Sequence, residues 1–451
     1  MLQVYDTLRR AQAPLQTRDE GRVSMYVCGP TVQSPPHVGH GRSAAAFDVI
    51  RRYLAWRGHE VTFVRNVTDI EDKIIAAAEE SGREVEDLAG EMERRFAWAF
   101  DGLGVLAPDI EPKATEHIEE IISLIGALVE RGLAYARGGD VYFSVRALDG
   151  YGKLSGRDLD ELRSGVRIEP AESKEDPLDF ALWKGRKPGE PWWESPWGPG
   201  RPGWHIECSA MATKYLGDRF DIHGGGADLI FPHHENEIAQ SEGAGGEGFA
   251  RYWLHNGMVN LGGEKMAKST GHVIDLAEII RRAGGRALRM LYVRAHYRSP
   301  IEFSDELLSD AAEALDRLDR FRRRAVAGPP DEAALGRFRE AMDDDFGTPR
   351  AMSVLFDLVR EGNRLLDEGA SAGSLAGAVE EIVGVLGLDD ASDREAPPPA
   401  LSDDEVRRLV EERERARAER RFDDADAIRD RLDAVGVGLE DGPDGARWLR
   451  R

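Results

Sequence analysis

The chain holds two cysteines, Cys28 and Cys208, and each lies inside a motif that is dense in polar residues and glycine. In the motif FPHHENE, His233 and Glu237 are four residues apart, and on a helix that spacing places both side chains on one face. His234 lies three residues before Glu237 and shares this face, so spacing leaves either histidine open. Two thiolates, an imidazole and a carboxylate suit Zn2+. The same spacing also permits two buried, inert thiols and an ordinary histidine on a helix face.

Two further motifs have residue types that suit a nucleotide. In PPHVGH, His37 and His40 flank Gly39 where a strand is expected to give way to a helix, whose first N–H groups suit phosphate. Both histidines could donate to phosphate oxygens, and the glycine would let the nucleotide approach closely. In KMAKS, Lys265 and Lys268 lie on a glycine-flanked loop and could neutralise the charge of a triphosphate. Each motif alone is weak, because packed histidine pairs and exposed lysines are common.

The apolar pattern predicts the elements that would position these motifs. Residues 23–28 alternate and predict a strand that ends in a turn at Gly29. Apolar residues spaced along 47–54 predict a helix that Gly58 ends. Residues 60–65 predict the next strand, and strand, helix and strand in this order form a βαβ unit of a parallel sheet. Ligands bind beyond the carboxyl ends of such strands, which is where Cys28 is expected.

The next part of the chain has the character of an insertion into this sheet. Residues 118–129 predict a helix with one apolar face, and residues 133–145 predict a hairpin around two glycines. The segment from about 146 to 203 is rich in Pro, Trp, Gly and charged residues. It is expected to divide the nucleotide-binding fold into two halves.

The sheet is expected to resume at residues 220–223, and a helix is expected to start near Pro232, since proline suits the first helical turn. From about residue 304 the pattern is helical and charged, with an apolar stripe that begins at Leu308. A Pro-rich linker at 396–400 precedes a last helical hairpin. The chain is therefore expected to end in helical parts that lie outside the sheet.

Composition limits the class of protein. The chain has 451 residues and a net charge of −23, which favours solubility and argues against broad nucleic-acid binding. Its start has no apolar segment typical of a secretory signal, and no apolar run approaches the length of a membrane span. We expect a cytoplasmic protein with no membrane contact. Three Arg-rich stretches, at 281–298, 317–324 and 413–421, are most simply solvated helix faces.

Taken together, the motifs resemble those of a known family along essentially the whole chain. The paired HVGH and KMAKS motifs resemble the HIGH and KMSKS signatures of class I aminoacyl-tRNA synthetases. Within that class, the chain resembles the cysteinyl-tRNA synthetases in the stretches YVCGPTV, FVRNVTDIEDKI, GRPGWHIECSAMA, FDIHGGGADLIFPHHENEIAQS, HYRSPIEFS and DADAIRDRLDAVGVGLED. The resemblance implies an α/β fold with a Rossmann-like parallel-sheet catalytic domain, split by an insertion and followed by an α-helical anticodon-binding region. It implies domain ranges of 1–303 with an insertion at about 118–203, then 304–395, then 396–451.

The resemblance also implies roles for particular residues. It maps the zinc ligands onto Cys28, Cys208, His233 and Glu237. It places the substrate cysteine near Gly29, Thr68 and Trp204. It places the nucleotide pocket at His37, Gly39, His40, Gly224, Gly226 and Asp228, with Lys268 as the ATP-binding lysine. The catalytic residues would be His37, His40, Lys265 and Lys268.

The activity implied by the resemblance is ligation of L-cysteine to tRNA(Cys). ATP, accompanied by Mg2+, would activate cysteine as an adenylate, and the cysteinyl group would pass to the terminal ribose of the tRNA. One zinc ion per chain would select the substrate thiolate, since serine and alanine offer no comparable ligand. Glu237 is the expected labile ligand, because catalytic zinc usually keeps a position open. A monomer is expected.

Two departures and two rival functions accompany this interpretation. The family usually carries Tyr-Asp where this chain has Gln33-Ser34, before Pro35-Pro36, and Ser where Ala267 stands. A ligase of the mycothiol pathway shares the active site, but it lacks a carboxylate matching Glu237 and the long C-terminal part. A non-enzymatic RNA-binding relative would keep the fold without the chemistry, which the intact motifs disfavour.

Overall fold

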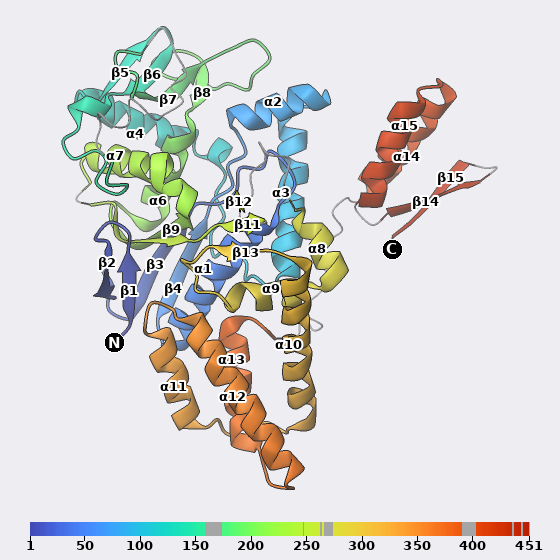
Figure 1. Cartoon of the computed structure of the whole chain (residues 1–451). Helices are drawn as coiled ribbons and strands as arrows, with labels where there is room; N and C mark the ends of the chain where they lie inside the picture. Colours follow the sequence, from blue (N-terminus) through green and yellow to red (C-terminus); the bar gives the residue numbers. More distant parts are fainter. Residues whose placement is uncertain are drawn as a thin grey trace.

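The computed structural model describes most of the chain, and Figure 1 shows its course. The described residues are 1–157, 174–246, 248–261, 264–265, 274–389, 403–434, 437–442 and 445–450. Lys268 and Ala267 lie outside them, and only the backbone of Lys265 is described. Among the described residues, no helix combines the length and the apolar character that crossing a membrane requires.

A four-stranded parallel sheet forms the centre of the N-terminal part of the chain, with strands in the order β10-β9-β3-β4. The strands are β3 (Arg22–Val27), β4 (Glu60–Arg65), β9 (Phe220–Gly226) and β10 (Ala250–Asn256). The first three confirm the strands predicted from the sequence, and β10 had not been predicted. In the register Val27 pairs with Gly224, so the carboxyl ends of β3 and β9 lie at the same edge.

Helix α1 (Val38–Trp56) joins β3 to β4 and confirms the predicted βαβ unit. Its buried face holds Phe47, Ile50 and Leu54, which belong to the main hydrophobic core. Two further helices, α2 (Asp72–Ser81) and α3 (Val85–Gly102), follow β4. Because α1 begins directly after the end of β3, its N-terminus lies at the edge where ligands are expected.

The predicted insertion folds around a hydrophobic cluster that also includes Ile206, Ala210 and Ala239 from the chain that follows it. Helix α4 (Ile118–Glu130) and the hairpin of β5 (Ala134–Arg137) and β6 (Asp140–Phe143) confirm the predicted helix and hairpin. Strands β7 (Phe180–Gly185) and β8 (Gly200–Pro202) complete an antiparallel sheet. The chain then returns through α6 (Trp204–Leu216) to β9, so the insertion separates the two halves of the parallel sheet (Figure 1).

The segment that carries FPHHENE differs from the expected helix start near Pro232. A single 3-10 turn, η3 (Ala227–Leu229), leads into a π-helical turn, η4 (Ile230–His234), and the regular helix α7 begins later (Glu235–Gly243). Proline has no N–H to donate, and Phe231 before it is extended, with φ of −140°. The N–H of Glu235 instead donates to the carbonyl of Ile230. The histidines therefore precede the regular helix.

Helical elements follow the sheet, as predicted. The small sheet β12-β11-β13 and two helices come first: β11 (Val259–Leu261), β12 (Glu264–Lys265), α8 (Leu276–Ala283), α9 (Gly285–Val293) and β13 (Ile301–Glu302). A helical bundle follows: α10 (Asp305–Arg324), α11 (Glu332–Met342), α12 (Thr348–Asp367) and α13 (Gly373–Leu386). The apolar stripe from Leu308 to Phe321 on α10 is buried, which confirms the predicted core face.

The two ends of the chain form small units. An N-terminal hairpin of β1 (Gln3–Asp6) and β2 (Ala11–Pro14) had not been predicted. The C-terminal unit contains α14 (Asp403–Ala418), α15 (Phe422–Ala434), β14 (Val437–Gly442) and β15 (Gly445–Arg450). Its apolar residues make a separate hydrophobic cluster, which indicates a small subdomain with its own core. The last two strands pair as a hairpin that had not been predicted.

Helix α1 is joined to the bundle by a buried ionic contact. Arg289 of α9 is fully buried, contacts the carboxylate of Asp48 and donates to the carbonyl of Leu386 at 2.8 Å. Arg52 donates to the same Asp48 carboxylate at 2.7 Å. Burial alone would raise the pKa of Asp48, but these two guanidinium groups outweigh it and lower that pKa below its ordinary value.

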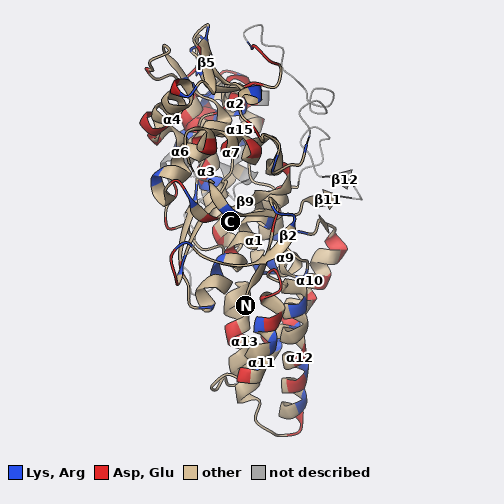
Figure 2. Cartoon of the chain, turned by 90° about the vertical axis from the view of Figure 1, so that its left-hand side faces the viewer, with Lys and Arg blue, Asp and Glu red and all other residues tan. Residues whose placement is uncertain are grey.

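Most arginines of the bundle are engaged with carboxylates. Arg320 contacts Asp316, Arg324 contacts Asp367, and Figure 2 shows basic and acidic residues interspersed along these helices. The expectation of solvated helix faces therefore fits the stretch 317–324. It is wrong for Arg289 in the stretch 281–298, because that guanidinium is buried against Asp48.

Candidate functional site

A cavity of about 280 Å³ opens at the carboxyl edge of the parallel sheet. Eight of the residues singled out from the sequence line it: Cys28, Gly29, His37, Gly39, His40, Trp204, Gly226 and Asp228. They come from the ends of β3 and β9 and from the starts of α1 and α6. The structure thus brings together motifs that are far apart in the sequence.

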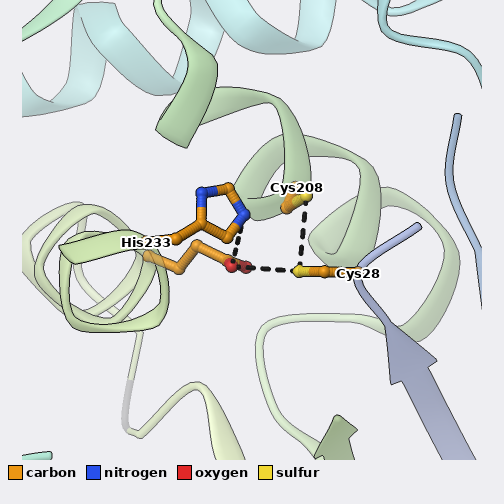
Figure 3. Close-up of side chains that lie close together, drawn as sticks. Cys28, Cys208 and His233 are labelled. Carbon is orange, nitrogen blue, oxygen red and sulfur yellow. Dashed lines mark hydrogen bonds and ion pairs between the residues drawn. The ribbon is translucent and has the colours of Figure 1, made fainter. Parts of the chain in front are cut away.

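Four side chains converge around Cys28, which lines this cavity. The Sγ atoms of Cys28 and Cys208 are 3.6 Å apart, and Cys28 Sγ lies 3.3 Å from Glu237 Oε1. His233 Nε2 lies 3.1 Å from the same Glu237 oxygen. Figure 3 shows Cys28, Cys208 and His233 pointing toward one another from three different segments. One ligand atom from each of the four residues lies within 4.8 Å of the others.

The protonation of this cluster depends on its burial. Burial raises the pKa of Cys28 well above its ordinary value, and Cys208 and Glu237 raise it further. Burial lowers the pKa of His233 to about 3, so its imidazole is neutral near pH 7. Burial alone would raise the pKa of Glu237, but His223 and His233 outweigh it and lower that pKa. The cluster therefore offers a neutral imidazole, a carboxylate and two thiols whose ionised form burial disfavours.

These residues fit a zinc ion on two counts. Their atoms are two sulfurs, a nitrogen and an oxygen, which is a typical set of zinc ligands. Zinc bonds of about 2.0–2.3 Å in a tetrahedron place neighbouring ligand atoms roughly 3.3–3.8 Å apart. The separations of 3.6, 3.3 and 3.1 Å in the cluster are close to these values.

A second group of four overlaps with the first. Cys28 and Glu237 also lie within 4.8 Å of nitrogen atoms of His223 and His234. His223 Nε2 is 2.8 Å from Glu237 Oε2. His234 Nδ1 is 2.8 Å from His255 Nε2, and its Nε2 has no hydrogen-bond partner among the described residues. The geometry therefore keeps open the choice between His233 and His234 that spacing had left.

Gly29 lies tightly against the end of β4. A Cβ atom at this position would meet the carbonyl oxygen of Asn66 at 1.6 Å, so no other residue fits without movement. The N–H of Gly29 donates to Asn66 Oδ1 at 2.8 Å. This contact fixes the segment that carries Cys28.

Thr68 lies behind this contact rather than in the wall of the cavity. It is buried, accepts from Asn66 Nδ2 at 3.2 Å and donates to Glu207 Oε2 at 3.1 Å. Burial raises the pKa of Glu207 well above its ordinary value. A substrate contact by Thr68 stays a prediction.

The two histidines of HVGH form the cap of α1. The N–H of Gly39 donates to His37 Nδ1, and the N–H of His37 donates to His40 Nδ1, both at 3.1 Å. Their rings stack with centroids 3.7 Å apart. Because each Nδ1 accepts a backbone N–H, a neutral ring carries its proton on Nε2. Both rings line the cavity, so their Nε2–H groups are the donors that a phosphate there could use.

The residues at the glycine-rich end of β9 have two different roles: one packs against α1, and the others line the cavity. A Cβ atom on Gly224 would meet the Phe47 ring at 2.3 Å, so this glycine permits close packing against α1. Gly226 and Asp228 line the cavity. The sequence had placed all three in the nucleotide pocket, and the structure separates Gly224 from the other two.

Sequence reasoning missed several polar residues around the cluster. His223, His255 and Asn66 are buried and contact the candidate ligands or their neighbours. Asn66 directly follows β4, so its position beyond a buried strand was an available signal, whereas His223 lies in the middle of β9. His255 belongs to β10, a strand that the sequence had not revealed.

Two family descriptions match the chain. Residues 14–313 match the family described as "tRNA synthetases class I (C) catalytic domain", and residues 337–389 match the one described as "DALR domain". The first match spans the parallel sheet with its insertion, and the second spans most of the helical bundle.

Solved structures share the fold. A methionyl-tRNA synthetase of Mycobacterium tuberculosis, bound by methionyl-adenylate, superimposes with a TM-score of 0.58 at 16% identity and covers 81% of this chain and 89% of its own. LeuRS of Agrobacterium radiobacter K84 in a ternary complex with tRNA gives 0.60 at 12% identity, over 83% of this chain and 84% of its own. At these identities the likeness shows the fold alone.

Relatives of known name are much closer in sequence. The chain is 50% identical over 460 residues to the cysteine–tRNA ligase of Thioalkalivibrio sulfidiphilus, and the match covers 100% of both chains. It is 48% identical over 480 residues to the cysteine–tRNA ligase of Geobacter sulfurreducens, covering 99% of both. The parallel sheet, its insertion and these full-length matches lead to one assignment: the chain belongs to the cysteine–tRNA ligases, a family of class I tRNA synthetases.

Proposed function

We propose that the chain activates L-cysteine with ATP and transfers it to the 3′-terminal ribose of tRNA(Cys), with zinc selecting the substrate thiolate. The observation that carries this proposal is the cluster of Cys28, Cys208, His233 and Glu237, of which Cys28 lines the cavity. Its ligand set suits zinc, and its position beside the α1 N-terminus suits an amino acid next to a nucleotide.

Selection of cysteine rests on sulfur chemistry. When bound, zinc would supply a Lewis-acidic contact that favours a thiolate over a hydroxyl group. Cys28, Cys208 and His233 would hold the ion, and Glu237 is the residue proposed to loosen. A hydrophobic pocket distinguishes side chains by only about 10- to 200-fold per methylene, so the contact to sulfur supplies the larger part of the discrimination.

The first step is formation of the adenylate. An oxygen of the cysteine carboxylate attacks the α-phosphorus of ATP, the bond to the β-phosphate oxygen breaks, and pyrophosphate leaves. The Nε2–H groups of His37 and His40, together with the positive end of the α1 helix dipole, stabilise the charge on the phosphate oxygens. Lys265 and Lys268 are proposed as further cations on residue type alone, and Mg2+ accompanies the nucleotide.

The second step uses the adenylate. A hydroxyl oxygen of the 3′-terminal ribose attacks the carbonyl carbon, the carbon–oxygen bond to AMP breaks, and the cysteinyl ester forms. The helical bundle and the C-terminal subdomain are proposed to bind the anticodon side of the tRNA.

The experiment is cysteine-dependent exchange of pyrophosphate into ATP, measured with cysteine and with serine. The proposal predicts exchange with cysteine and a rate with serine that is lower by more than about 200-fold, the limit for discrimination by size. Absence of exchange from protein that holds stoichiometric zinc would refute the proposed activity.

A further inference from the structure

Lys73 is a cation in the wall of the cavity that the proposed function does not yet use. It is the second residue of α2, its side chain is exposed, and it lines the cavity together with Cys28 and Trp204. Its Nζ lies 5.7 Å from the centroid of the Trp204 ring, within the range of a cation–π contact. The ammonium is therefore held over an aromatic face at the site.

The carboxylates nearest in sequence are engaged elsewhere. Asp72 contacts Lys184 of β7 and Arg201 of β8, which join α2 to the insertion beside it (Figure 1). Glu71 caps α2 by accepting the backbone N–H of Lys73 at 2.7 Å. Within the described part of the chain, Lys73 forms no ion pair with a carboxylate. Its charge is thus available to an anion that enters the cavity.

The order of His233, Trp204 and Lys73, from the buried cluster to the solvent, indicates which anion Lys73 meets. His233 is buried in the candidate metal cluster, and its ring stacks on that of Trp204 with centroids 4.5 Å apart. The exposed Lys73 lies over the same Trp204 ring. A cysteine substrate whose sulfur reaches the cluster lies at the buried end, near His233. The tRNA acceptor enters from solvent and therefore meets Lys73 first.

The net charge of the chain also favours a nucleic acid as the anion that Lys73 meets. At −23 the protein repels a polyanion as a whole, so the entering end of a nucleic acid needs cations placed locally. Lysine acts as a flexible point charge on phosphate and requires no fixed geometry. From these observations we propose that Lys73 binds a phosphate of the 3′ end of the tRNA and guides the terminal ribose to the adenylate. This inference rests on the proposed transfer to tRNA.

The test compares Lys73→Met with Lys187→Met, a matched loss of one exposed lysine outside the cavity wall. Cysteine-dependent pyrophosphate exchange reports adenylate formation, and aminoacylation at varied tRNA concentration reports transfer. Lys73→Met is expected to lower kcat/KM for tRNA by about tenfold more than it lowers exchange, as for loss of one charge-assisted contact. The Lys187→Met protein should match wild type in both assays.

Salt dependence gives a second readout. For one lost contact to a single-stranded phosphate, the slope of log kcat/KM for tRNA against log salt should become shallower by about 0.7. Lys73→Arg, which keeps the charge, should restore most of the slope.

Equal losses of exchange and transfer in Lys73→Met would overturn the inference, because Lys73 would then act on cysteine or ATP. If the Lys73→Met protein charges tRNA as well as wild type does, with an unchanged salt slope, this inference is overturned and the proposed function stands. A wild-type protein that forms adenylate but charges no tRNA would refute the proposed transfer and this inference with it.

Discussion

Replacing Gly29 by alanine places a methyl group where a backbone carbonyl already lies. The added Cβ would be 1.6 Å from the oxygen of Asn66, and real Cβ atoms essentially never approach such an atom within 3.0 Å. The ends of β3 and β4 would have to separate by at least 1.4 Å, the difference between these distances. Because Cys28 precedes Gly29 directly, the candidate metal ligand would move with it.

The expected loss of activity follows from that displacement. A misplacement of about 1 Å in a catalytic constellation costs roughly 100-fold in rate, which corresponds to about 2.7 kcal/mol of transition-state stabilisation. Gly29→Ala is therefore expected to lower kcat/KM for cysteine in pyrophosphate exchange by about 100-fold or more. Zinc content, far-UV circular dichroism and thermal unfolding would be measured on the same sample to separate local displacement from loss of the fold.

The control is Gly126→Ala, in the interior of α4, where an added Cβ meets no atom within 4 Å. Alanine should stabilise this helix by roughly 0.5–1 kcal/mol and leave exchange unchanged. A Gly29→Ala protein with exchange within threefold of wild type would refute the reasoning, because the close contact would then have no consequence for the site.

Three further predictions concern stability and the C-terminal part. Arg289→Met should lower the free energy of unfolding by about 3–5 kcal/mol in urea titrations, because it leaves the buried Asp48 with one cation fewer; an unchanged midpoint would contradict this. The pKa of Asp48 is below its ordinary value in the folded state, so its contribution is present above the unfolded pKa of about 3.9 and is lost as pH falls through the lower folded value. Asp48→Asn should therefore lose less stability than wild type between pH 7 and pH 3, and a parallel loss would count against the ionic contact. Deleting residues 396–451, which include a separately clustered core, should reduce aminoacylation more than pyrophosphate exchange; equal losses would indicate a role in stability instead.

The parallel sheet was predictable where its strands carry a local signal. Residues 23–28 alternate between apolar and polar side chains and end at Gly29, so β3 could be recognised without its partners. Strand β10 could not, because its sequence ARYWLHN is buried on both faces and shows no alternation. A strand at this place in the sheet is defined by its pairing with β9, which the local sequence does not contain.

The candidate site was predictable in its residue types but not in its surroundings. Cys28 and Cys208 could be singled out because they are the only cysteines and lie in distinctive motifs. The approach of His223 in β9 to Glu237 in α7 depends on how the turns η3 and η4 fold α7 back onto the strand, which spacing along the chain does not encode. Thr68 could be named as a substrate contact from the family resemblance alone, and its side chain contacts Asn66 and Glu207 and does not line the cavity.

Zinc content per chain shows whether Cys28, Cys208, His233 and Glu237 hold a zinc ion. The measurement would compare wild type with Cys28→Ser and with the neighbouring pair His233→Asn and His234→Asn. We predict one zinc ion per chain in wild type and in His234→Asn, and clearly less in Cys28→Ser and His233→Asn. Full zinc content in Cys28→Ser, or loss of zinc from His234→Asn with retention in His233→Asn, would contradict the proposed ligand set.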